Sequence, residues 1–142
     1  MTRATVKFEE LIEAFEFVSS AQPAEHAAFL CAQTGKIHWH TELSDDMEPL
    51  PDDMDVPGKH IAIPHKNDLD LGKALALRFV GEVLPEAIGK AQHIFSRAGA
   101  YARFKDFLEQ RGLLQQWYEY EGQARERALR QWCQDSGIQV ES

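Results

Sequence analysis

The sequence predicts one α+β domain over residues 1–142, with an N-terminal helix, a small antiparallel sheet (a hairpin plus a third strand) and a helical C-terminal half. Apolar residues recur at helical spacing before residue 20, and two short segments flank a Thr-Gly turn near residue 35. Beyond residue 66 the apolar spacing is helical again. Strands followed by a run of helices are typical of the α+β class. A chain of 142 residues is also long enough to bury a hydrophobic core.

The first helix is expected over residues 6–19. Its apolar residues follow the i, i+3, i+4, i+7 spacing of one helix face: Phe8, Leu11, Ile12, Phe15 and Val18. Four glutamates occupy the opposite, solvent face: Glu9, Glu10, Glu13 and Glu16. Pro23 then interrupts the pattern, so the helix must end before it.

A β-hairpin is expected next, with the loop 32–35 between its strands. Gly35 stands where such a loop needs a left-handed residue. This loop pairs Leu30 with Ile37 and Ala28 with Trp39, which gives the hairpin one apolar face. The less apolar face then carries Phe29, Cys31, Lys36, His38 and His40.

An acidic, flexible loop is predicted at 43–58, because this segment combines three prolines with many carboxylates and has no apolar pattern. It lacks the residue order of a calcium-binding loop. Residues 60–64 alternate apolar and polar side chains and end at Pro64, which predicts the third strand.

Four helices are expected in the C-terminal half. The first is capped by Asn67 or Asp68, and the second runs from Pro85 to about Phe95. The third follows Gly99 and ends at Gly112, and the last closes at Gly137. The last helix is expected to turn five residues inward: Leu114, Trp117, Ala124, Ala128 and Trp132.

The net charge of −8 is unevenly distributed. From Ile94 onward the chain carries seven basic and seven acidic residues, so residues 1–93 hold the whole acidic excess. An acidic chain repels phosphate backbones, which argues against general nucleic-acid binding but leaves room for a local anion site near the C-terminal arginines. The sequence shows no membrane-spanning apolar segment and no secretory signal, so we expect a cytoplasmic protein with reduced thiols.

His38 and His40 raise the question of a metal site, because alternate strand residues point to the same side of a sheet. A metal site needs three or four ligands and a second shell. We interpret the two histidines as half-exposed strand residues and predict no cofactor. The alternative is a metal-dependent enzyme in which the acidic loop supplies a third ligand. Cys31 near Lys36 is a further candidate, as a thiolate, but we interpret it as an inert, half-buried residue.

The most distinctive segment is FSRAGAYARFKDFLEQRGLLQQWYEYE at 95–121, with the block Gly99–Asp106 at its centre. With the Thr34-Gly35 turn and the Ile63-Pro64 strand end, this block resembles the bacterial uncharacterised protein family (UPF) zero-one-five-eight over nearly the whole chain. The resemblance implies no established activity and no catalytic residues. It also implies that the side-chain cap of the turn is missing, because Cys31 stands where many members have Asp.

Two interpretations concern charged residues of this segment. Extending the third helix back to Arg97 puts this arginine on an apolar stripe, and Glu121 lies in line with Trp117. Arg97 and Glu121 are therefore a candidate interhelical pair, although Glu121 can instead pair with Arg125 one turn further on.

A candidate binding surface comprises Arg103, Lys105, Tyr118 and Tyr120, because arginine and tyrosine are favoured at interfaces. The alternative is that the aromatic rings pack in the core while the basic side chains lie solvated at its rim.

Three classes of function remain. We expect a non-catalytic binding or regulatory module that engages a protein or a small anion through its C-terminal helices. The alternatives are a metal-dependent enzyme that uses His38 and His40, and a nucleic-acid-binding protein. The sequence does not predict an oligomeric state.

Overall fold

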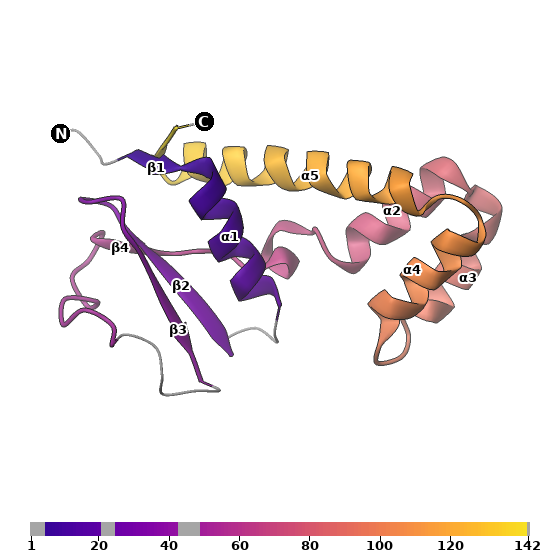
Figure 1. Ribbon diagram of the computed structural model, residues 1–142, viewed down its shortest axis with the longest axis horizontal. Helices are drawn as coiled ribbons and strands as arrows, with labels where there is room; N and C mark the ends of the chain where they lie inside the picture. The colour runs from indigo at the N-terminus through magenta and orange to yellow at the C-terminus, as the bar shows by residue number, and fades with distance from the viewer. Residues whose placement is uncertain (1–4, 21–24, 43–48, 142) are drawn as a thin grey trace. The chain divides into compact units, whose positions relative to one another are not determined.

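The computed structural model describes residues 5–20, 25–42 and 49–141. The predicted α+β class is confirmed, with an N-terminal helix, a three-stranded antiparallel sheet and a helical C-terminal half (Figure 1). The chain forms two compact units: unit 1 comprises residues 1–69 and 128–142, and unit 2 comprises residues 70–127. No helix in the described part of the chain is both long and apolar enough to cross a membrane.

Unit 1 contains the sheet, whose strands are β2 (His26–Cys31), β3 (Ile37–Thr41) and β4 (His60–Ala62) in the order β3-β2-β4. The predicted hairpin register is confirmed, since Leu30 pairs with Ile37 and Ala28 with Trp39. Gly35 has a φ of 77°, the left-handed conformation that the loop requires. The third strand is also confirmed, and it pairs antiparallel with β2.

Helix α1 (Phe8–Ser19) packs against one face of this sheet. Phe17 of α1 stacks on His26 and lies 4.8 Å from the ring of Trp39, centroid to centroid. The apolar residues of α1 and the even-numbered residues of β2 form a buried core between them: Leu11, Ala14, Phe15, Val18, Ala28 and Leu30. The amphipathic pattern therefore predicted the correct buried face of the helix.

A parallel pair of short strands was not predicted. β1 (Thr5–Lys7) pairs with β5 (Gln139–Glu141), with Val6 opposite Val140. Helix α1 consequently begins at Phe8, two residues later than predicted, and the completely buried Val6 belongs to the strand.

Unit 2 contains α2 (Lys73–Val83), α3 (Ile88–Ile94), α4 (Ala100–Gln110) and residues 114–127 of α5 (Leu114–Asp135). Its core is aromatic. The ring of Trp117, which is fully buried, lies 5.3 Å from that of Phe79 and 5.2 Å from that of Phe104. Such edge-to-face contacts between aromatic rings stabilise a core beyond the area that they bury.

Several predicted helix limits were wrong. Asp68 caps a short 3-10 turn, η1 (Lys66–Leu69), by accepting a hydrogen bond from the backbone N–H of His65, and α2 begins only at Lys73. The segment after Pro85 starts as another 3-10 turn, η2 (Pro85–Ala87), before α3. In the last helix, Trp132 is only half-buried, because Leu129 and Cys133 occupy the inward positions.

Candidate functional site

Two of the four residues predicted to form a binding surface lie together. The ammonium group of Lys105 on α4 lies over the ring of Tyr118 on α5, 5.7 Å from its centroid. Tyr118 is 43% exposed and is one of two large hydrophobic side chains described as exposed. A cation held over an exposed aromatic ring can bind a carboxylate while the ring supplies apolar contact area. We call this pair the Lys105–Tyr118 surface.

The other two residues lie elsewhere. Tyr120 packs against Phe79, with 5.1 Å between ring centroids. Burial and the nearby Glu82 carboxylate raise its pKa, so it remains a neutral phenol. The guanidinium group of Arg103 turns back toward α3, where its Nη2 donates to the carbonyl oxygen of Ile94 at 3.4 Å. The four residues therefore do not form one surface.

Arg97 and Glu121 do not form the predicted pair: no ion pair joins them in the described structure. The reason is the start of α4. Gly99, with a φ of 73°, stands before Ala100, so Arg97 lies in an exposed turn outside the helix. Glu121 instead lies near Tyr101, where burial and the glutamate charge raise the pKa of the phenol to about 12.

His38 and His40 share a face of β3, as predicted, but they have different neighbours. The ring of His38 lies edge-on to His60 at a centroid distance of 5.6 Å, and Nε2 of His40 lies 3.1 Å from a carboxylate oxygen of Glu42. In the described residues, no group of three His, Cys, Asp or Glu side chains could hold a metal ion. The metal-dependent alternative therefore has no third ligand in that part of the chain.

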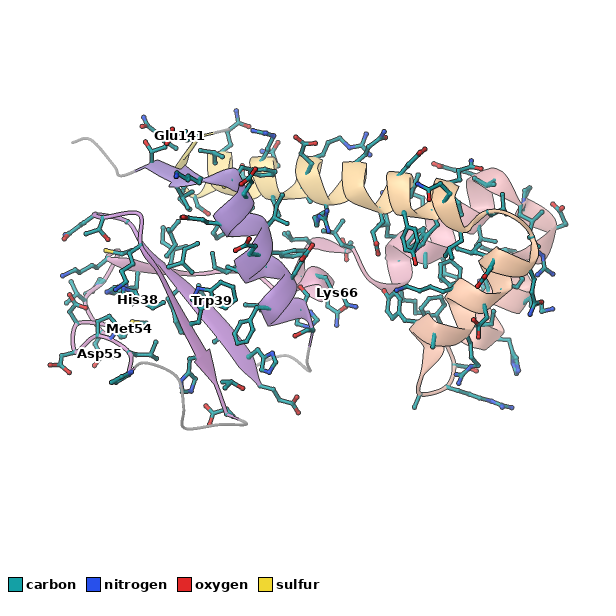
Figure 2. The ribbon with its side chains drawn as sticks, viewed as in Figure 1. His38, Trp39, Met54, Asp55, Lys66 and Glu141 are labelled. Carbon is teal, nitrogen blue, oxygen red and sulfur yellow. The ribbon has the colours of Figure 1, made fainter. Side chains whose placement is uncertain are left out.

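A polar cluster covers the face of the sheet opposite α1. His38 lies toward the loop that carries Met54 and Asp55, whereas Trp39 lies toward α1 (Figure 2). In this loop, Asp53 forms an ion pair with Lys59 and accepts a hydrogen bond from Nε2 of His60 at 2.9 Å. These hydrogen bonds lower the pKa of Asp53 from 3.8 to about 2, the one from Lys59 contributing most.

The predicted flexible loop at 43–58 falls only partly within the structure, because residues 43–48 lie outside the described residues. The described remainder contains a turn that the backbone N–H of Val56 closes on the carbonyl of Asp53. Asp53 then joins this turn to the start of β4 through Lys59 and His60. That part of the segment is therefore fixed to the sheet by charged side chains.

Cys31 lies at the edge of the same cluster. Hydrogen bonding from Thr34 and Gln33 favours the charged form of its thiol and so lowers the pKa. Burial raises the pKa of the thiol, but these donors and the Lys59 charge outweigh that effect, so the pKa lies below its ordinary 9.0.

Cys31 and His60 face each other across β2 and β4. The neighbouring pair is joined by a hydrogen bond from the backbone N–H of Ala32 to the carbonyl of Lys59, so Cys31 and His60 form a non-hydrogen-bonded pair. Side chains in such pairs approach closely, with Cβ atoms roughly 4.5–5.5 Å apart. The sequence showed Cys31 and His38 on this face and an acidic loop after the hairpin, but no pattern in it identified Asp53, Lys59 and His60 as the residues that join them.

Comparison with known proteins gives no relative: no family model, curated protein or solved structure matches the chain.

Proposed function

We propose that the protein is a non-catalytic binding module of the cytoplasm, which engages an acidic segment of a protein partner through the Lys105–Tyr118 surface. The observation that carries the proposal is the exposed ring of Tyr118 with the Lys105 ammonium group held over it. Membership of the family (UPF) zero-one-five-eight remains a separate proposal, on which this one does not depend.

The charge of unit 2 supports an acidic partner. Unit 2 carries nine basic and eight acidic residues, whereas unit 1 carries six basic and fifteen acidic ones. An acidic segment is repelled by unit 1 and meets a nearly neutral surface on unit 2, where Lys105 supplies a local positive charge.

A protein segment suits the surface better than a small anion. A small anion is held by several converging donors. Here Arg103 is directed to the end of α3, and Lys105 is the one cation that lies over the ring of Tyr118 among the described residues. In a peptide, a carboxylate can bind the ammonium group while a neighbouring apolar side chain packs on the exposed ring. The two contacts together bind more tightly than one charge alone.

The test is a binding titration with fluorescent acidic peptides, using polyglutamate and a copolymer of glutamate and leucine. We expect the copolymer to bind more tightly than polyglutamate. Lys105→Ala should weaken its binding about tenfold, the loss of one charge-assisted hydrogen bond. Tyr118→Ala should remove the advantage of the copolymer.

Lys73→Ala is the matched control, since Lys73 is an exposed lysine at the start of α2 in the same unit. It should leave the affinity unchanged. If Lys73→Ala weakens binding as much as Lys105→Ala does, the attraction is diffuse, and the proposed surface is wrong. Equal affinity of Tyr118→Ala and the unmutated protein for the copolymer would also contradict the proposal.

A further inference from the structure

The outer edge of β3 carries backbone groups that no strand of the described residues meets. The sheet has the order β3-β2-β4, so β3 and β4 form its two edges. On its inner side, the hydrogen bonds of β3 involve even-numbered residues: the Lys36 carbonyl accepts from the N–H of Cys31 at 2.8 Å, and the N–H of Glu42 donates at 2.9 Å. Bonded residues alternate along an antiparallel strand, so the N–H and C=O groups of Ile37 and Trp39 point away from β2.

β3 lacks two features that protect edge strands from further pairing, short length and proline. The opposite edge has both, because β4 spans three residues and Pro64 follows shortly after it. β3 spans five residues, contains no proline and includes Ile37, Trp39 and Thr41, which are residue types that favour strands. Ile37 and Trp39 are only half-buried, so a further strand would cover apolar surface there. The edge at β3 is therefore the one that a further strand fits.

The charges that flank β3 indicate which strand fits. Lys36 precedes the strand and Glu42 follows it, and both side chains are exposed. We propose that unit 1 binds a second copy of the chain through this edge, with the two β3 strands antiparallel around a two-fold axis at Trp39. An antiparallel copy runs in the reverse order, so Lys36 of each copy lies opposite Glu42 of the other. Opposite charges at directly opposed positions stabilise a strand pair. This interface is separate from the Lys105–Tyr118 surface and does not depend on it.

Strand length and charge both favour the axis at Trp39. This register pairs β3 along its whole length and joins residues whose backbone groups point outward. An axis one residue away, at His38 or His40, separates Lys36 from Glu42 and leaves one end of each strand unpaired. The acidic excess of unit 1 opposes association at long range. At about 0.1 M salt this repulsion is largely screened beyond about 10 Å, whereas opposed charges in contact lose less of their attraction.

The first test measures the mass of the whole protein by sedimentation equilibrium in about 0.1 M NaCl, from micromolar to near-millimolar concentration. We expect a concentration-dependent equilibrium between one chain and two. A monomeric mass at every concentration would overturn the proposal. A mass that continues to rise beyond two chains would also contradict it, because a contact between two identical edges around a two-fold axis is closed.

Charge exchange tests the contact between the copies. Lys36→Glu and Glu42→Lys should each weaken the dimer about tenfold or more, because each places like charges opposite each other at both ends of the strand pair. The double variant restores opposite charges and should recover the affinity of the unmutated protein. Within one copy the two residues lie about 20 Å apart along the strand, so the recovery can only arise between copies. Lys7→Glu and Glu9→Lys, exposed elsewhere in unit 1, are controls with the same charge changes. Equal weakening in these controls, or no recovery in the double variant, would refute the pairing.

Disulfide trapping tests the position of the axis. In the proposed register, His38 of one copy lies opposite His40 of the other in a non-hydrogen-bonded pair, whose Cα atoms are about 4.5 Å apart and within reach of a disulfide. A mixture of His38→Cys and His40→Cys should therefore form a mixed disulfide on mild oxidation. Both variants also carry Cys31→Ala, because Cys31 lies on the same face of the sheet. Either variant alone should form few disulfides, since its introduced cysteines lie diagonally, roughly 7–8 Å apart. Equal yields of mixed and like disulfides, or no mixed disulfide, would exclude an axis at Trp39 and overturn the proposal.

Discussion

Trp117 is the largest fully buried side chain of the described residues, and its ring contacts both Phe79 and Phe104 in the core of unit 2. Trp117→Ala should lower the free energy of unfolding by about 3–5 kcal/mol. Trp117→Phe should lower the free energy of unfolding by less. It keeps an aromatic ring in the core and removes an indole N–H that is buried without a hydrogen-bond partner in the described structure. Urea unfolding measures both. Trp132→Ala is the comparison, and its half-buried ring should give a smaller loss; equal losses would contradict this description of the core.

Asp53 should make the stability of unit 1 depend on pH in acid. Its pKa is about 2 in the folded protein against an ordinary 3.8, so its contribution is complete above about pH 4 and disappears as the pH falls toward 2. In Asp53→Asn, the free energy of unfolding should therefore change less between pH 4 and pH 2 than in the unmutated protein. Urea unfolding at several pH values measures this difference. Asp55→Asn is the control. Parallel curves for Asp53→Asn and the unmutated protein would show that the carboxylate is not held in this way.

At the residue scale, positions set by local geometry could be predicted and long-range partners could not. The pairing of Leu30 with Ile37 followed from the loop 32–35, because the length of a hairpin loop fixes the register of its two strands. Whether Tyr118 or Tyr120 would meet Lys105 depended on how α4 packs against α5, which no local pattern determines. Asp53 likewise joins His60 through a loop whose course has no periodic signal.

At the element scale, the end of α4 is closed by glycine. Gly112 has a φ of 70°, and the N–H of Leu113 donates to the carbonyl of Leu108 at 2.9 Å, the pattern of a helix that ends in a left-handed residue. A side chain at Gly112 would meet open space, so Gly112→Ala causes no steric clash. It should lower the free energy of unfolding by about 1–2 kcal/mol, because only the left-handed backbone conformation disfavours alanine there.

Gly122 is the matched position within α5, with equally open space but an ordinary helical conformation. Gly122→Ala should stabilise the protein by roughly 0.8–1 kcal/mol, the opposite sign to Gly112→Ala. Urea unfolding of the two variants measures both effects. The same sign in both would mean that the conformation at Gly112 does not control the end of α4.

The β1–β5 pair shows what sequence patterns miss at this scale. Each strand has three residues, too few for a recognisable alternation, and its partner lies at the other end of the chain. The pair is nevertheless part of the core of unit 1. Val6→Ala should cost about 2 kcal/mol, from two buried methyl groups and the space they leave, whereas Thr5→Ala, exposed on the same strand, should change stability little. Equal effects, measured by urea unfolding, would contradict the pairing.

For the whole molecule, the spacing of apolar residues predicted the fold class and the charge count predicted an uneven charge distribution, but neither predicted where the acidic part ends. The acidic excess was assigned to residues before Ile94, whereas it follows unit 1, to which Arg130, Asp135 and Glu141 also belong. The reason is that residues 128–142 join the N-terminal segments through β5, a contact across the full length of the chain. Whether the two units behave as the single predicted domain remains a prediction.

This division predicts a salt dependence of stability. Unit 1, with fifteen acidic and six basic residues, repels itself, and salt screens repulsion as the Debye length falls from about 30 Å at 0.01 M to about 10 Å at 0.1 M. The melting temperature should therefore rise by a few degrees with added NaCl. Glu13→Gln, on the exposed face of α1, should raise it at low salt and lose that advantage at high salt, whereas Glu119→Gln, exposed in the nearly neutral unit 2, should have little effect. A melting temperature that falls with salt would mean that ion pairs such as that of Asp53 with Lys59 outweigh the repulsion between like charges.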